Sequence, residues 1–166
     1  MSKLNNFSTI DAILPQLREI FGDRLSLDKH VLREHGHDVS RHDIQAPQAV
    51  IYPLNTEEVS SAVKLCHAHY VPVILFGTGT AVEGGVVAIY GGLSIDLANM
   101  NQVLAVNVTD TDATVQAGVT RYQLNDALQN QGTDLVFTVD PGANASLGGM
   151  AATRASGSSA VKYGTM

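Results

Sequence analysis

The sequence predicts an α+β fold, in which a small βαβ α/β subdomain is followed by an incomplete antiparallel sheet. Residues 49–76 have the pattern strand, helix, strand, which is typical of parallel strands joined by a crossover helix. After residue 100, short apolar segments alternate with turns, as antiparallel strands do. We therefore expect an N-terminal helical segment (1–45), a first subdomain (46–100) and a second subdomain (101–166).

Composition limits the classes of partner. The net charge of −6 and the lack of a basic block argue against nucleic acid as the main partner. No apolar run reaches the ~20 residues of a membrane-spanning helix, so we expect no transmembrane segment. The single cysteine excludes an internal disulfide. The N-terminal residues have no apolar signal core, and we expect a cytoplasmic protein.

The N-terminal segment begins with a predicted helix from Ser8 to Phe21. Its apolar stripe is Ile10, Ile13, Leu14, Leu17 and Phe21, and Gly22 ends it. A second short helix is expected over residues 25–32.

Residues 35–48 hold three histidines, His35, His37 and His42, together with Asp38 and Asp43. A metal site is one interpretation of this cluster. The i, i+2 spacing of His35 and His37 gives poor geometry for two ligands on a helix, so we favour a polar loop and expect no metal site.

Residues 49–53 predict a short buried strand that ends at proline. Asn55 can then cap a helix, with Glu58 at the position of a capping box. Val59, Ala62, Val63 and Cys66 would form the buried face of this helix. Cys66 is interpreted as a small buried hydrophobe rather than a nucleophile.

A second buried strand, residues 71–76, leads into the glycine loop Gly77-Thr78-Gly79-Thr80, with Gly84 and Gly85 further on. Ligands of open α/β sheets bind at such carboxyl ends. The loop matches neither the dinucleotide fingerprint nor the Walker A motif. Considered alone, it is as consistent with two turns as with a ligand loop.

The second half contains predicted strands at 93–97, 103–108 and 113–117, and a helix from Thr120 to Gly132 that opens with a T-x-x-Q capping box. The apolar side of this helix would be formed by Tyr122, Leu124, Ala127 and Leu128. Another short strand is expected at 135–137. The next segment, residues 140–157, consists almost entirely of small residues. Ser146 can cap a short helix there and present N–H donors to a phosphate. Two such segments suit an elongated diphosphate cofactor.

Six ordered motifs resemble a known family. They are QAVIYP (48–53), TEEV (56–59), VILFGTGT (73–80), DPG (140–142), SLGGM (146–150) and ATRASG (152–157). They resemble the FAD-binding domain of the vanillyl-alcohol oxidase/p-cresol methylhydroxylase (PCMH) type, most of all that of FAD-linked 2-hydroxy-acid oxidoreductases such as cytochrome-type D-lactate dehydrogenases and the flavin subunit of glycolate oxidase. The resemblance covers residues from about 40 onward.

The resemblance implies a set of cofactor-binding residues. In the family, the first glycine loop wraps the FAD pyrophosphate and the second segment lines the flavin. Carried over, the first group is Phe76, Gly77, Thr78, Gly79, Thr80 and Gly84. The second group is Pro141, Gly142, Ser146, Gly148, Gly149, Thr153, Ala155 and Gly157.

Some relatives attach flavin covalently through a histidine at the place where this chain has Thr80, so the resemblance implies noncovalent FAD. It also implies oxidation of a 2-hydroxy acid, D-lactate or glycolate, to the 2-oxo acid. Family members continue into a substrate domain, so this chain is expected to be an inactive fragment with no catalytic residue of its own.

Two alternatives remain open at this point. One is a noncatalytic subunit or interaction module that no longer binds flavin. The other is a flavin oxidoreductase of the same fold that acts on a sugar lactone or an aromatic alcohol. A truncated sheet would expose a strand edge, so we expect pairing with a missing half, a partner subunit or another copy of the chain.

Overall fold

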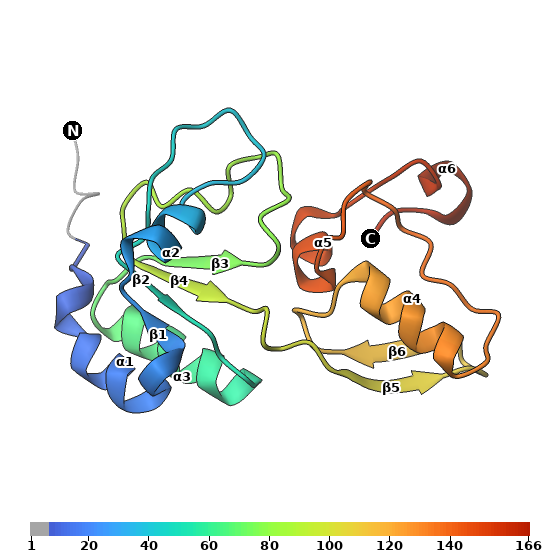
Figure 1. Ribbon diagram of the computed structural model, residues 1–166, viewed down its shortest axis with the longest axis horizontal. Coiled ribbons are helices and arrows are strands. Elements are labelled where there is room, and N and C mark those ends of the chain that lie inside the picture. The colour runs from blue at the N-terminus through green and yellow to red at the C-terminus, as the bar shows by residue number, and fades with distance from the viewer. Residues whose placement is uncertain (1–6) are drawn as a thin grey trace. The chain divides into compact units, whose positions relative to one another are not determined.

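The computed structural model describes residues 7–166, which divide into two compact units, one ending at Leu97 and the other beginning at Ala98 (Figure 1). Each unit is described by itself. The N-terminal segment is part of the first unit, because its helix supplies core residues and its short strand joins the sheet. Among the described residues, no helix is long and apolar enough to cross a membrane.

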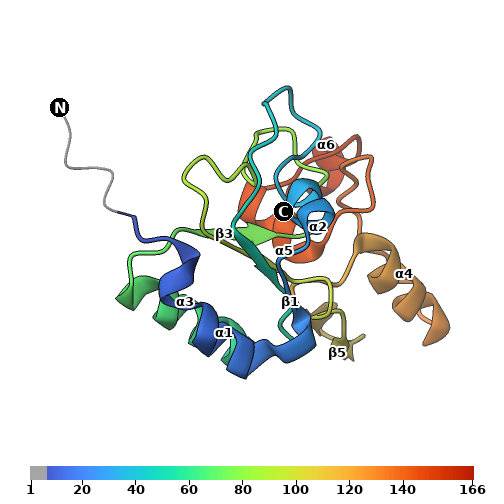
Figure 2. The same ribbon diagram turned by 60° about the vertical axis from the view of Figure 1, so that its left-hand side comes forward.

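The first unit is a four-stranded sheet with helices on both faces. Its elements are η1 (Ile10–Ala12), α1 (Leu14–Phe21), η2 (Gly22–Arg24), β1 (Leu25–Ser26), α2 (Lys29–Glu34), β2 (Ala49–Ile51), α3 (Thr56–Ala68), β3 (Val73–Phe76) and β4 (Leu93–Asp96). Figures 1 and 2 show α1 and α3 side by side on one face of the sheet. One buried cluster is formed by Ile13, which directly precedes α1, Leu17 of α1, Cys66 of α3, and Ile51 and Ile95 of the strands.

The predicted first helix is split in two. A 3₁₀ turn ends at Ala12, and the α-helix begins at Leu14 with Pro15 in its first turn. Proline lacks the N–H that would continue the hydrogen-bond ladder back to Asp11, so the helix restarts there. The predicted stripe is largely confirmed, since only Leu14 of its five residues is incompletely buried.

The predicted helix over 25–32 is wrong in its first half. Leu25 and Ser26 form a strand that pairs antiparallel with Ile51 and Val50. Helix α2 begins only after Asp28, whose carboxylate accepts hydrogen bonds from the N–H groups of His30 and Val31 at 2.9 and 3.2 Å. The cap, and not the preceding apolar residues, sets this boundary.

Helix α3 begins as predicted, because the Asn55 side chain accepts a hydrogen bond from the Glu58 N–H at 2.9 Å. The Glu58 carboxylate does not return to Asn55: it accepts from the Leu54 N–H at 2.8 Å and pairs with Arg24 through two hydrogen bonds of 2.5 and 2.8 Å. On the buried face the prediction for Val63 is wrong, since 40% of it is exposed.

Cys66 is fully buried, and burial raises the pKa of its thiol to about 11. A thiol that stays protonated is a poor nucleophile. The structure therefore agrees with its interpretation as a small core hydrophobe.

Strand order corrects the predicted βαβ pair. The sheet runs β1-β2-β4-β3, so β2 and β3 are parallel but are separated by β4, which pairs parallel with both. All four residues of β4 are buried. Strand β3 lies at the edge, and Leu75 is 57% exposed, so the expectation of a buried strand over 71–76 is wrong.

The second unit holds the hairpin β5 (Val103–Asn107) and β6 (Asp112–Val115), followed by α4 (Arg121–Asn130), α5 (Leu147–Thr153) and α6 (Ala160–Tyr163). The hairpin is antiparallel, as predicted. The capping box of α4 is also confirmed: Thr120 accepts from the Gln123 N–H, and Gln123 accepts from the Thr120 N–H. Its core gathers Val119, Leu124, Leu128, Val139, Leu147 and Met150.

Two predictions in the second unit are wrong. Residues 135–137 form no strand, because the Phe137 N–H donates to the Asn125 side chain at 2.8 Å instead of to a neighbouring strand. Tyr122, placed on the buried side of the helix, is exposed, and the Arg121 guanidinium lies 4.5 Å from its ring centroid.

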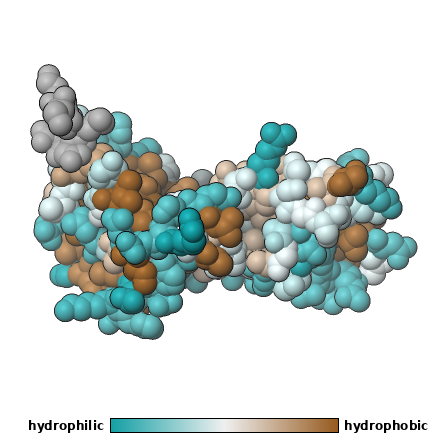
Figure 3. All heavy atoms as spheres, turned by 90° about the horizontal axis from the view of Figure 1, so that it is seen from above, coloured by the Kyte–Doolittle hydropathy of each residue, from teal (hydrophilic) through white to brown (hydrophobic). Residues whose placement is uncertain are grey.

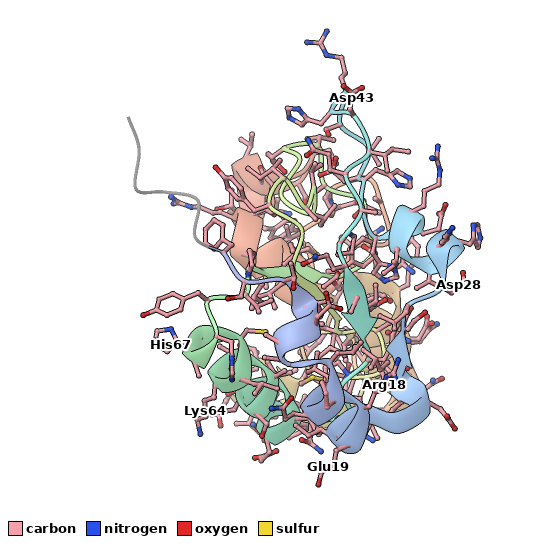
Figure 4. The ribbon with its side chains drawn as sticks, turned by 90° about the vertical axis from the view of Figure 1, so that its left-hand side faces the viewer. Arg18, Glu19, Asp28, Asp43, Lys64 and His67 are labelled. Carbon is pink, nitrogen blue, oxygen red and sulfur yellow. The ribbon has the colours of Figure 1, made fainter. Side chains whose placement is uncertain are left out.

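Charged side chains cover the outer surface of the first unit. Figure 4 shows Glu19, Lys64 and His67 at the edge of the view, on the outward sides of α1 and α3. Seen from above, the surface has patches of hydrophobic residues separated by hydrophilic ones (Figure 3).

The Arg24–Glu58 pair fastens the N-terminal segment to α3, and its removal has a measurable cost. The hydrogen bond from Arg24 and its charge lower the pKa of Glu58, although burial opposes this. We expect Glu58→Gln to reduce the free energy of unfolding at pH 7 by about 1–2 kcal/mol. Because the pKa of Glu58 is lowered in the folded protein, its ionised carboxylate stabilises the fold at pH values above the ordinary carboxyl pKa of 4.5. This contribution is lost as the pH falls through the lowered pKa.

The measurement is urea unfolding of the wild type and the variant at pH 7 and at pH 4. Glu57→Gln is the matched control, since Glu57 carries the same charge in the same first turn and is exposed. Equal losses in the two variants would show that the pair contributes nothing beyond the helix dipole.

Candidate functional site

The first candidate segment is the loop that follows β3. It contains the first group of residues that the sequence singled out, from Phe76 at the end of the strand through the glycine loop to Gly84. Within the described part of the chain, the backbone N–H groups of residues 77–81 donate to no protein acceptor. Unpaired donors are usually satisfied by a ligand or by water. Five consecutive donors at the carboxyl end of a parallel strand fit an anionic group.

The phenyl ring of Phe76 supports this loop from below. Gly79 has a φ of +66°, and a Cβ built on it would lie 3.0 Å from the tip of the Phe76 ring. The loop backbone therefore rests on the ring at Gly79, in a conformation that favours glycine. The hydroxyls of Thr78 and Thr80 lie 3.1 Å apart and are hydrogen-bonded to each other.

Residues of the 35–48 loop hold the far end of the glycine loop. The buried Asp38 carboxylate accepts from the Gly84 N–H at 2.8 Å and from the Ser40 N–H at 2.9 Å. The Val39 N–H donates to the Ala81 carbonyl at 3.0 Å. Burial acts to raise the pKa of Asp38, but the hydrogen bonds from Ser40 and Gly84 outweigh it, so the pKa is lowered. Gly84 thus helps to shape the loop, while its own N–H is already used.

The same two loops border an open hollow of about 720 Å³, lined by Val39, Ser40, Arg41, His42 and Val82. None of these five is a residue that the sequence marked for a cofactor. The unpaired donors of residues 77–81, and not this hollow, have the chemistry of an anion site.

In the second segment, the start of α5 offers fewer free donors than expected. Ser146 precedes α5 as predicted, but its side chain makes no capping hydrogen bond. The N–H groups of Leu147 and Gly148 donate to the carbonyls of Val119 and Ala117 at 2.8 and 2.9 Å, so these two donors are used within the unit. The Gly149 N–H donates to no protein acceptor in the described part of the chain, and a phosphate at this helix start stays a prediction.

Two glycines of this segment are required by packing. A Cβ on Gly148 would lie 2.8 Å from the Ala117 carbonyl oxygen, and one on Gly157 would overlap the Asp140 carbonyl. The need for glycine at these two positions is therefore explained inside the unit. Gly149 differs, since its added Cβ would meet only the Ser146 hydroxyl at 3.0 Å.

The remaining predicted residues of the segment lie in turns or at its surface. Pro141 and Gly142 form a turn in which the Gly142 N–H donates to the Asp140 carboxylate at 2.9 Å. The Thr153 hydroxyl donates to the Gly149 carbonyl, and the Ala155 N–H to the Met150 carbonyl. Residues 156–158 have backbone N–H groups without a protein acceptor in the described chain. The segment thus also has unpaired donors after α5.

A buried pair that the sequence reasoning missed lies beside the first loop. His35 Nε2 is 2.9 Å from the Asp96 carboxylate, and both side chains are less than a tenth exposed. His35 Nδ1 lies 2.8 Å from the Val31 carbonyl oxygen. The signal was Asp96 itself, because a carboxylate at the end of an apolar central strand needs a partner. Nothing in the sequence pattern identified His35 as that partner.

The histidine-rich segment is a loop, as favoured above. His35 turns inward to Asp96, whereas Asp43 lies at the outer tip of the loop (Figure 4). No group of three or more metal-ligating side chains is present among residues 7–166.

Comparison with known proteins extends these observations. The FAD binding domain family matches residues 47–166. A probable mitochondrial D-lactate dehydrogenase of Danio rerio is 46% identical over 160 residues, 96% of this chain and 32% of the relative. The glycolate oxidase subunit GlcD of Bacillus subtilis is 35% identical over 120 residues, 71% of this chain and 25% of the relative. The chain thus spans about a third or less of the length of these relatives.

Solved structures agree on the fold. An alkyldihydroxyacetonephosphate synthase matches 98% of this chain and 32% of its own with a TM-score of 0.84 and 28% identity. A p-cresol methylhydroxylase matches 76% of this chain and 26% of its own with a TM-score of 0.66, and its 21% identity supports the fold alone. The predicted PCMH-type fold and the resemblance to 2-hydroxy-acid oxidoreductases are confirmed. Since the family match covers well over half of its residues, this chain belongs to the FAD binding domain family.

Proposed function

We propose that this chain is the FAD-holding part of an oxidoreductase that converts a 2-hydroxy acid, D-lactate or glycolate, to the 2-oxo acid. The observation that carries the proposal is the run of five unpaired backbone donors at residues 77–81. Relatives named as D-lactate dehydrogenases and as a glycolate oxidase subunit support the substrate class. When bound, FAD supplies the hydride acceptor for such an oxidation.

The first loop would hold the pyrophosphate of FAD. Its donors are neutral amides, which can bind a doubly charged diphosphate without a lysine. Phe76 supports the loop beneath Gly79, and Asp38 fixes its far end through Gly84. These contacts hold the donors in place before the ligand arrives, which lowers the entropic cost of binding.

The second segment would line the flavin with small residues. Gly142, Gly149 and Ala155 expose little more than backbone, and the unpaired amides of residues 156–158 add donors. Gly148 and Gly157 contribute indirectly, since each allows a close approach of two backbone segments. Three further residues of the predicted set would act on the conformation of the segment. Ser146 directly precedes α5, the Thr153 hydroxyl donates to the Gly149 carbonyl at the end of this helix, and Pro141 lies in the preceding turn.

We further propose that FAD is bound noncovalently. Thr80 stands where some relatives have the flavin-linked histidine, and its hydroxyl is hydrogen-bonded to Thr78. An alcohol is a much weaker nucleophile than imidazole.

The cytoplasmic location expected from the sequence stays a prediction, and the Danio rerio relative is named as mitochondrial. Pairing with a partner subunit or another copy also stays a prediction.

FAD binding by the purified chain tests the proposal. Titration of the 166-residue protein with FAD should quench flavin fluorescence to saturation, and acid precipitation should release all flavin into the supernatant. Lack of binding would favour the alternative of a noncatalytic module without flavin. Flavin that sediments with the polypeptide after acid treatment would contradict the noncovalent mode.

Gly79→Ala tests the role of the first loop. The added Cβ meets the Phe76 ring at 3.0 Å at a φ of +66°, which costs an L-residue about 1–2 kcal/mol. Displacing the loop donors should weaken FAD binding about tenfold. Gly85→Ala is the matched control, because its Cβ would meet nothing within 4 Å, and it should leave the dissociation constant within about twofold of wild type. Equal effects of both variants would refute the role of the loop.

Activity of the chain alone forms a separate prediction. The relatives named as D-lactate dehydrogenases are about three times as long, so we expect the FAD-loaded 166-residue chain not to oxidise D-lactate or glycolate. An assay with a dye as electron acceptor measures this. Turnover above that of free FAD would show that residues 1–166 suffice for catalysis.

A further inference from the structure

The buried His35 lies between two groups that can only accept hydrogen bonds. Its Nδ1 is 2.8 Å from the Val31 carbonyl oxygen and its Nε2 is 2.9 Å from the Asp96 carboxylate. A carbonyl has no proton to give, and neither does an ionised carboxylate. With Asp96 ionised, both ring nitrogens must carry hydrogen to bond both groups, so this arrangement favours the imidazolium form of His35.

The His35 ring also contacts the residue on which the glycine loop rests. Its centroid lies 4.3 Å from that of Phe76. Phe76 is paired with Asp96 in the parallel ladder, and its carbonyl accepts from the Leu97 N–H at 3.1 Å. The tip of the Phe76 ring in turn supports Gly79. One continuous series of contacts thus runs from Asp96 through His35 and Phe76 to the unpaired donors of the loop.

From this geometry we propose that His35 is a positioning residue for FAD: its protonated ring, paired with Asp96, holds Phe76 and the glycine loop in the binding conformation. The inference rests on the proposed function. Loss of one proton would leave the ring a single N–H, so it could no longer donate to both Asp96 and Val31, and its hold on Phe76 would weaken. FAD affinity should then fall as His35 is deprotonated, and by linkage FAD should favour the protonated ring.

The groups around His35 determine the direction of the pH dependence. Burial acts to lower the pKa of His35, but hydrogen bonds to Asp96 and Val31 and the nearby charges of Asp96 and Glu34 outweigh it, so the pKa is raised. Tyr52, edge-on to the ring at 6.0 Å, has a pKa raised by burial and by Asp96 and stays neutral. Because the pKa of His35 is raised in the folded protein, the protonated ring stabilises the fold fully at pH values below the ordinary histidine pKa of 6.5. This stabilisation is lost as the pH rises through the raised pKa.

The test compares the FAD dissociation constants of the wild type, His35→Gln and His37→Gln between pH 6 and pH 9. His37 is the matched control. It is a half-buried histidine of the same loop whose Nδ1 lies 3.2 Å from the carbonyl oxygen of Arg33, four residues back, as His35 Nδ1 lies near that of Val31. Unlike His35, it is not paired with Asp96. Wild type and His37→Gln should bind about tenfold more weakly at pH 9 than at pH 6. His35→Gln, which does not titrate, should bind weakly at both, with a flat profile.

A second measurement needs no variant. The NMR titration of the His35 ring in the wild type should give a higher pKa with FAD than without it. An unchanged His35 pKa on FAD binding, or a pH profile of His35→Gln that parallels the wild type, would overturn the inference while leaving FAD binding intact. Failure of the wild type to bind FAD at any pH would refute the proposed function, and this inference with it.

Discussion

The first unit depends on the central position of β4. This strand is hydrogen-bonded to β2 on one side and to β3 on the other, and every one of its residues is buried. Parallel strands need long crossovers, and residues 77–92 provide the one that places β4 between its neighbours. The glycine loop is therefore part of the connection that closes the sheet, and its first residues emerge beside the end of the central strand.

The two glycine-rich segments differ in how they use their backbone donors. Residues 77–81 leave theirs unpaired, which makes them suitable for an anion. At the start of α5, by contrast, Leu147 and Gly148 donate to the carbonyls of residues 119 and 117. Glycine content alone cannot separate these cases, since a glycine is needed equally for a ligand contact and for the close backbone approach at Gly157.

Polar contacts fasten the N-terminal segment to the sheet that carries the loop. Arg24 pairs with Glu58, His35 with Asp96, and Asp38 with the Gly84 amide. Breaking a buried polar pair is costly, because the remaining partner is left without water or a hydrogen bond. A segment whose sequence suggested a separate helical extension is thus integral to the shape of the candidate FAD site.

The sequence by itself determined the family, the order of helices and strands over residues 49–130 and the helix starts at Asn55 and Thr120, because these follow from local periodicity, capping and motif order. Only the tertiary structure decided the strand order, the exposure of Leu75, the loss of the strand at 135–137 and the partner of Asp96. Each of these depends on contacts between residues far apart in the chain. His35 and Asp96 are separated by 61 positions, and no local pattern records that folding brings them within a hydrogen bond.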